Sequence, residues 1–373
     1  MDALMLPLNW QKVRLGDIGK PCMCKRVMKH QTTRYGEIPF YKIGTFGNTA
    51  DAFISKKLFL EYKTKYSFPK KGDILISASG TIGRAVIYDG KPAYFQDSNI
   101  VWIDNDETLV KNDFLFYAYS NVKWNTEHTT ILRLYNDNFR NTLIPLPPLN
   151  EQIAIANILS GLDRYLYALD ALILKKESVK KALSFELLSQ RKRLKGFNQA
   201  WQRVRFGDIA NYLTSNLSAE QIVQQGKIKV YDVNNFIGYT DTTFISDKPY
   251  ISIVKDGSVG RVRILPPKTN ILSTMGALIA NHKTTTEFLF YLLSNFDFKN
   301  FTSGSIIPHI YFKDYKEKTI FLPPLNEQSA IANILSALDN EIISLKNKKR
   351  QFENIKKALN HDLMSAKIRV LEK

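Results

Sequence analysis

The sequence predicts two similar globular domains, each followed by a long helix, with the two helices paired as an antiparallel coiled coil. Residues 147–164 (PPLNEQIAIANILSGLDR) and 323–340 (PPLNEQSAIANILSALDN) are identical at fifteen of eighteen positions. Upstream, residues 10–18 (WQKVRLGDI) and 201–209 (WQRVRFGDI) are identical at seven of nine positions. Because both pairs occur in the same order, the chain is an internal repeat, and we expect a pseudo-two-fold axis between its halves.

The regions enclosed by these repeated segments differ in length and sequence. They span 137 residues from Trp10 to Pro147 and 122 residues from Trp201 to Pro323. A shorter repeated motif, Gly-[Ser/Thr]-x-Gly-Arg, occurs as GTIGR at 80–84 and as GSVGR at 257–261. A tight hairpin turn, in which the glycines adopt positive φ, would explain this motif. We divide the chain into a first domain, a central helix, a second domain and a C-terminal helix, with boundaries at 1–147, 148–197, 198–323 and 324–373. The repeated motifs are shared by the two halves, whereas the regions between them differ. This pattern suggests that the two domains have related functions and act on different targets.

A long helix is predicted after each PPLNEQ segment. Asn150 and Asn326 are good N-cap residues, and the heptad pattern continues to about Lys195 and Ala366. Lysines interrupt both apolar seams, and we expect them to weaken packing there. A coiled coil used only to dimerise two chains is an alternative. The predicted seam positions are Ile155, Leu159, Leu162, Leu166, Leu169, Ile173, Lys176, Lys180, Leu183 and Leu187, then Ile331, Leu335, Leu338, Ile342, Leu345, Lys349, Phe352, Lys356, Leu359 and Leu363.

Charge and composition narrow the classes of partner. The net charge is +17, and each of the four segments carries a positive excess, which indicates an extended basic surface and favours a phosphate-bearing or acidic partner. No apolar run is long enough to span a bilayer, and the first ten residues do not resemble a signal peptide, so we expect a cytoplasmic protein without a membrane partner. Cys22 and Cys24, even with His30, lack the second pair of ligands that would complete a zinc site, so two reduced thiols are expected and no metal ligands are assigned.

Signatures of catalysis are absent from the sequence. It contains no Gly-x-x-x-x-Gly-Lys-[Ser/Thr] loop, and no proline pair is followed by the aromatic residue typical of adenine methyltransferases. Asp51, Glu61 and Lys63 can be arranged into a nuclease-like string, but such strings are common in lysine-rich chains. We therefore predict two basic domains and no catalytic centre.

The repeated motifs resemble the specificity subunits of type I restriction-modification enzymes over the whole chain. The resemblance rests on residues 145–163 and 321–339, on the WQ-x-VR-x-GDI segments, and on GDILISASGTIGR at 72–84. It implies that each domain is an α/β (α+β) target-recognition domain reading one half of a bipartite, asymmetric double-stranded DNA site. It also implies that the antiparallel helices set the spacer between half-sites.

The same resemblance implies partners that supply the chemistry. Two modification subunits would bind S-adenosylmethionine and methylate adenine N6, and restriction subunits would hydrolyse ATP with Mg²⁺ and cleave DNA, so this chain itself would need no cofactor. The modification subunits would dock on the helices and on the residues at their starts. Those docking residues are Pro147, Pro148, Asn150, Glu151, Gln152, Pro323, Pro324, Asn326, Glu327 and Gln328.

Candidate DNA contacts are basic or polar side chains of the two domains, since such groups reach base edges and phosphates. Arg84 and Arg261 occupy the same place in the Gly-x-x-Gly-Arg echo, so we expect phosphate contacts from them. The full set is Lys25, Arg26, Arg34, Lys42, Arg84 and Arg133 in the first domain, and Lys229, Arg261, Arg263, Lys268, His309 and Lys313 in the second.

Three alternatives stay open at this point. The chain could serve a modification-only complex without a nuclease partner. It could be a scaffold that joins proteins and has no DNA specificity. It could also be a nuclease built on Asp51, Glu61 and Lys63, which purified protein with magnesium would test.

Overall fold

The computed structural model describes residues 7–128 and 132–370. Two compact units divide the chain: residues 1–169 with 348–373 form the first, and 170–347 form the second. Each unit therefore contains one globular domain, the beginning of the helix that follows this domain, and the end of the other helix. The four predicted segments follow the sequence from one end to the other. The compact units differ from them because each long helix is divided between the two units.

The first domain is built on a four-stranded antiparallel sheet beside a smaller mixed sheet. Its core lies between the larger sheet, helix α3 (Asn112–Tyr119) and the start of the long helix, which supplies Ile155 and Leu159. The domain has three further helices, α1 (Leu15–Ile18), α2 (Lys56–Lys65) and α4 (Asn136–Asn141). The large sheet has the order β2 (Gly19–Met23), β8 (Ile100–Asn105), β5 (Ile74–Ser77), β6 (Ala85–Ile87), and the small sheet β4 (Ala52–Ile54), β3 (Ile38–Tyr41), β7 (Tyr94–Phe95).

The second domain repeats this arrangement. Its helix α6 (Thr286–Ser294) packs on the larger sheet as α3 does in the first domain, and a short helix α7 (Phe312–Tyr315) follows. The sheets are mostly antiparallel, which confirms the α+β character of the predicted domains. The large sheet has the order β13 (Ala210–Thr214), β19 (Met275–Ala280), β16 (Tyr250–Val254), β17 (Val262–Leu265), and the small sheet β15 (Phe236–Thr240), β14 (Ile228–Tyr231), β18 (Thr269–Ile271).

The two repeated motifs of each half pair with each other. Strand β1 (Gln11–Arg14) of WQKVRLGDI runs antiparallel to β11 (Leu143–Leu146), which leads into PPLNEQ. In the second unit β12 (Gln202–Arg205) pairs in the same way with β22 (Thr319–Leu322). In each domain, two segments more than a hundred residues apart thus form one two-stranded antiparallel sheet. This pairing explains why both motifs occur in each half of the chain.

The long helices are α5 (Leu149–Leu188) and α8 (Leu325–Met364), each of 40 residues. Every predicted seam position is buried or half-buried, so the heptad prediction is confirmed. The N-cap prediction is wrong: each helix begins one residue before its asparagine, and Asn150 Oδ1 accepts a hydrogen bond from the next backbone N–H, at 3.0 Å. The predicted ends were too late, above all for α5. Gln190 and Ala366, each two residues past a helix, have positive φ values of 61° and 56°, and this conformation ends a helix.

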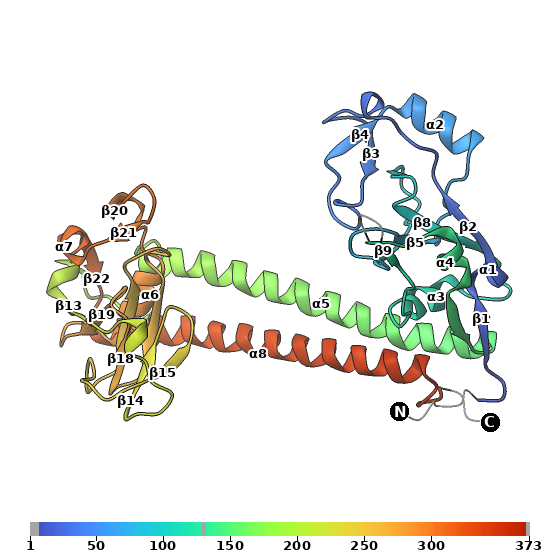
Figure 1. The fold of residues 1–373 in the computed structure, drawn as a ribbon. Helices are drawn as coiled ribbons and strands as arrows, with labels where there is room; N and C mark the ends of the chain where they lie inside the picture. The colour runs from blue at the N-terminus through green and yellow to red at the C-terminus, as the bar shows by residue number, and fades with distance from the viewer. Residues whose placement is uncertain (1–6, 129–131, 371–373) are drawn as a thin grey trace. The chain divides into compact units, whose positions relative to one another are not determined.

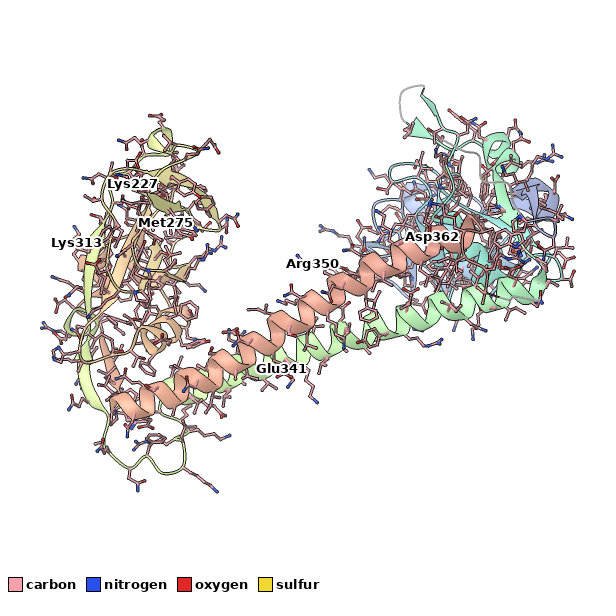
Figure 2. The ribbon with its side chains drawn as sticks, turned by 90° about the horizontal axis from the view of Figure 1, so that it is seen from below. Lys227, Met275, Lys313, Glu341, Arg350 and Asp362 are labelled. Atoms are coloured by element: carbon pink, nitrogen blue, oxygen red, sulfur yellow. The ribbon has the colours of Figure 1, made fainter. Side chains whose placement is uncertain are left out.

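Within each unit the two helices run antiparallel, as predicted. In the first unit Tyr165 of α5 packs on Phe352 of α8, with 4.7 Å between ring centroids, and Asp163 pairs with Lys356. In the second unit Lys180 of α5 pairs with Asp339 of α8 at 2.5 Å. Figure 1 shows the last turns of α8 (red) beside the first turns of α5 (green), and Figure 2 places Asp362 in this last part of α8. The Arg369 guanidinium lies 3.4 Å from Asn9 Oδ1, so the C-terminal segment lies near the beginning of the chain, as expected.

The Gly-x-x-Gly-Arg echoes form the predicted hairpin turns. They join β5 to β6 in the first domain and β16 to β17 in the second, both antiparallel. All four glycines have φ between 67° and 83°, a region that side chains disfavour. The second glycine of each turn lies under an aromatic ring, Trp124 over Gly83 and Phe298 over Gly260. This packing fixes the turn that carries Arg84 or Arg261.

Candidate functional site

A buried glutamate stands at the start of each long helix. Glu151 accepts hydrogen bonds from the Trp10 indole at 3.0 Å and from Arg369, Nε at 2.6 Å and Nη2 at 2.9 Å. Glu327 is bound in the same manner by Trp201 at 3.0 Å and by Arg193, Nη2 at 2.6 Å. Because a buried carboxylate is costly unless it is paired, these contacts explain why Trp and Glu recur in both motifs. Each arginine comes from the segment after the other helix, so the junction joins the domain to both helices.

The neighbouring glutamines, Gln152 and Gln328, also form hydrogen bonds within the chain. The Gln152 side chain accepts from Lys111 N at 2.9 Å and donates to the carbonyls of Leu109 and Pro147. Gln328 accepts from the Thr284 hydroxyl at 2.8 Å and donates to the Pro323 carbonyl at 2.8 Å. Each glutamine therefore ties the first turn of its helix to the loop before α3 or α6.

These positions change the docking prediction for four residues. As whole residues, Glu151, Gln152, Glu327 and Gln328 are at most 2% exposed, so in this structure they are not available on a docking surface. The family resemblance had placed them on such a surface, but each finds its hydrogen-bond partners within the chain. Pro147 and Pro323 are also buried, whereas Pro148 and Pro324 are half-buried and Asn150 and Asn326 are exposed. For these four accessible residues docking stays a prediction.

A lysine–aspartate–tyrosine cluster follows along each helix pair. In the first unit Asp163 pairs with Lys356 and accepts a hydrogen bond from the Tyr117 hydroxyl at 2.7 Å. The second unit repeats it, with Asp339 paired to Lys180 and the Tyr291 hydroxyl at 2.9 Å. Burial and the adjacent carboxylate raise the pKa of both tyrosines, so their hydroxyls stay protonated donors. Lys180 and Lys356, two of the four lysines in the predicted seams, thus take part in clusters that link α5, α8 and α3 or α6.

Two of the four predicted arginines of the first domain contact a loop that sequence reasoning missed. Asn99 Oδ1 accepts from Arg133 Nη2 at 2.9 Å and from the Ser79 hydroxyl at 2.8 Å. Two residues earlier, Asp97 pairs with Arg26 at 3.1 Å. Ser98 between them has a positive φ of 52°, a strained conformation that is frequent at binding sites. Loop 97–99 therefore gathers two of the predicted basic residues.

The other first-domain candidates have different surroundings. Lys42 pairs with Asp51 at 2.8 Å, and the Lys25 ammonium lies 5.1 Å from the centre of the Tyr66 ring. Arg34 and Arg84 are exposed. All six predicted residues are at least partly accessible, which contact with DNA requires.

In the second domain four of the six predicted residues form two groups. Arg261 Nη2 donates to the Asn234 side chain at 2.8 Å and Arg263 Nη1 to the Asn234 carbonyl at 2.9 Å, so this asparagine orients both arginines. A second group follows the chain from His309, which is 2.7 Å from Asp256, to Tyr311 and Lys313. Lys229 and Lys268 are exposed and belong to neither group.

A groove of about 740 Å³ adjoins the second group. Lys255, Lys313 and Lys316 contribute its basic lining, and Tyr311 and Phe312 its aromatic lining. Its acidic residues Asp208 and Glu317 are both paired with Arg205, and this arginine holds the pKa of Asp208 below its usual range. Sequence reasoning missed Lys255 and Lys316, because only folding brings these residues together.

The nuclease-like string is dispersed in the structure. Asp51 pairs with Lys42, Glu61 pairs with Lys65, and Lys63 packs on Phe59 and Phe68. Over residues 7–128 and 132–370, no group of three His, Cys, Asp or Glu side chains could hold a metal ion. Cys22 and Cys24 are free, as predicted, and burial raises the pKa of Cys24 to about 12. In the same part of the chain, no helix is both long enough and apolar enough to cross a bilayer.

Comparisons with known proteins agree with the repeat. A sequence model described as type I restriction modification DNA specificity domain matches residues 7–177 and again residues 198–354. The type I restriction enzyme MjaVIII specificity subunit of Methanocaldococcus jannaschii is 26% identical over 99% of this chain and 95% of its own length. A Haemophilus influenzae relative named as a type I specificity subunit is 64% identical, but over only 40% of each chain.

A solved structure shows the same fold. The S subunit of a type I restriction-modification system from M. genitalium covers 97% of this chain and 98% of its own, with a TM-score of 0.64 and 20% identity. Both domains and both helices of the chain are thus accounted for by one architecture. The chain belongs to the family of type I restriction-modification DNA specificity subunits, which are non-catalytic.

Proposed function

We propose that each domain reads one half of a bipartite, asymmetric DNA site. The observation that carries this proposal is the repeat itself: the DNA specificity model matches twice, and the two matched regions differ where basic side chains are accessible. Arg261 and Arg263 around Asn234, and Arg26 and Arg133 around loop 97–99, supply donors of the kind that contact bases and phosphates.

In this proposal the antiparallel helices determine the spacer between the half-sites. Each domain is tied to both helices by a buried glutamate and by a lysine–aspartate–tyrosine cluster, so a domain has little freedom to turn on its own helix ends. Inserting four residues, about one helical turn, into both α5 and α8 should lengthen the spacer. An unchanged spacer would contradict this part of the proposal.

Partner subunits would supply the chemistry. Two modification subunits with S-adenosylmethionine would methylate adenine N6, and restriction subunits with ATP and Mg²⁺ would cleave the DNA, all in the cytoplasm. Apolar side chains on the outer surface of the helices, among them Ile153 at 45% and Leu325 at 48% exposure, lie next to Asn150 and Asn326 and are suited to docking. A modification-only complex would use the same surfaces, and the genes beside this one would distinguish the two assemblies.

The test is to map methylated adenines in DNA from cells that express the chain with its modification subunits. We expect one bipartite motif with a methylated adenine in each half. Replacing residues 20–140 with the corresponding region of a relative should change one half only. A change in both halves would contradict the modular arrangement, and a protein scaffold without DNA specificity would yield no motif and no salt-dependent DNA binding.

A further inference from the structure

The second domain carries an exposed apolar hairpin tip. Strands β20 (Thr302–Ser303) and β21 (His309–Ile310) pair antiparallel and enclose residues 304–308. At this tip Ile306 is 91% exposed and Ile307 is 54% exposed. Burying two adjacent isoleucines against a partner would gain the free energy of removing their apolar surface from water. Their exposure therefore suggests that this tip contacts a partner.

This tip is held firmly against the Gly-x-x-Gly-Arg turn. Gly257 N donates to the Pro308 carbonyl at 2.8 Å, and Ile310 N donates to the Lys255 carbonyl at 2.9 Å. A side-chain contact of 2.7 Å between His309 and Asp256 closes the same junction. The isoleucines are therefore presented from a fixed position beside the turn that carries Arg261.

The charges around the tip favour a nucleic acid over a protein partner. Lys255 and Lys313 line the basic groove next to the hairpin, and the Lys313 ammonium lies 5.4 Å from the centre of the Tyr311 ring. Figure 1 shows β20, β21 and α7 at one end of the domain, and Figure 2 labels Lys313 there. The acidic residue in contact with the hairpin, Asp256, is engaged by His309. Apolar side chains flanked by cations suit DNA, because the cations meet phosphates while the isoleucines meet bases.

The first domain keeps the attachment of this hairpin, while the residues that connect the two strands differ in number and sequence. There β9 (Glu127–His128) pairs with β10 (Leu132–Arg133), and Ser79 is bridged to Arg133 as Asp256 is bridged to His309. Three residues separate these strands, against five in the second domain, and the two sequences differ; residues 129–131 lie outside the described part of the chain. A constant attachment with a variable tip is the pattern expected of a specificity element.

We propose that Ile306 and Ile307 contact thymine methyl groups in the half-site that the second domain reads. Apolar side chains recognise this methyl group in the major groove, where it distinguishes thymine from the other bases. The inference rests on the proposed function, under which each half-site contains a methylatable adenine and therefore at least one paired thymine.

The test compares Ile306→Ala and the double variant Ile306→Ala/Ile307→Ala with Ser305→Ala, which alters the same tip and keeps both isoleucines. Each full chain is purified with its modification subunits and titrated with duplexes carrying the mapped site or a scrambled second half-site. We expect roughly tenfold weaker binding of Ile306→Ala to the mapped site. Binding to the scrambled duplex and the salt dependence should match the wild type, since no phosphate contact is lost.

Deoxyuridine, which lacks the methyl group, makes the test direct. Replacing the thymines of the second half-site with deoxyuridine should weaken binding of the wild type and of Ser305→Ala, but add little to the double variant. A wild type indifferent to this replacement would overturn the inference, as would equal loss by Ile306→Ala on both duplexes. Reduced recovery of modification subunits with Ile306→Ala would show a protein contact instead. A wild type without preference for the mapped site would contradict the proposed function itself.

Discussion

Arg369 donates two hydrogen bonds to Glu151, which lies 218 positions earlier at the start of the other long helix. Arg193 and Glu327 form the same pair in the second unit, and the sequence offset of 176 residues relates the two pairs. Each pair joins the segment after one helix to the first turn of the other. The C-terminal segment thus does for the first domain what the segment between the domains does for the second.

Loss of this contact should destabilise the first unit. Arg369→Ala leaves the Glu151 side chain, 3% exposed, without its charged partner, and we expect the free energy of unfolding to fall by about 3–5 kcal/mol. Urea denaturation of the full chain measures this change. The control is Lys367→Ala, whose partner Asp362 lies 3.8 Å away at the surface, with an expected change below about 0.5 kcal/mol. Glu151→Gln should offset part of the loss in the double variant; full additivity would contradict a direct interaction.

The two glycines of the GTIGR turn should differ in their tolerance of alanine. A Cβ at Gly83 would come within 2.0 Å of the Trp124 indole, whereas a Cβ at Gly80 would meet its nearest neighbour, Ile43, at 3.8 Å. We expect Gly80→Ala to cost about 1–2 kcal/mol from its positive φ alone, and Gly83→Ala to cost more. Thermal unfolding distinguishes them, and equal effects would show that the indole does not fix the turn.

Arg84 should act on the DNA backbone. Arg84→Ala should weaken binding to every duplex and reduce the slope of log K against log salt by about 0.9, the value for one lost phosphate contact. The matched control is Arg140→Ala, an exposed arginine on α4 of the same domain. Binding assays from low to moderate salt test this expectation. An altered sequence preference with an unchanged slope would make Arg84 a base-reading residue.

Cys24 should resist alkylation in the folded chain. The reactive species is the thiolate, and burial raises the pKa of Cys24 to about 12, so almost none is present at pH 8. Burial also raises the pKa of Cys22, but this thiol is more accessible and should react first. Iodoacetamide labelling followed by mass spectrometry measures both sites, and urea-unfolded chain, in which both should react, is the control. Labelling of Cys24 at the rate of Cys22 would show that its site opens readily.

Patterns between nearby residues were enough to predict much of this protein. The long helices and the hairpin turns were predicted because heptads and glycine pairs reflect local geometry. The antiparallel pairing was predicted from the order of the repeated segments and the pseudo-two-fold relation between the halves. The predicted caps at Asn150 and Asn326 failed because prolines before them allow each helix to begin one residue earlier. The α/β class of the two domains was supplied only by family resemblance, and their strand topology was not predicted, since the short strands pair across long sequence separations.

Only the tertiary structure decided which polar residues face inward. In the sequence, Glu151 and Gln152 look like exposed polar residues at a helix start, and Lys180 and Lys356 look like defects in an apolar seam. Their actual surroundings come from Trp10, Arg369 and other residues that local patterns do not connect with them. A polar side chain is stable in a protein interior only when its hydrogen bonds are satisfied, and in this chain the partners arrive only when distant segments pack together.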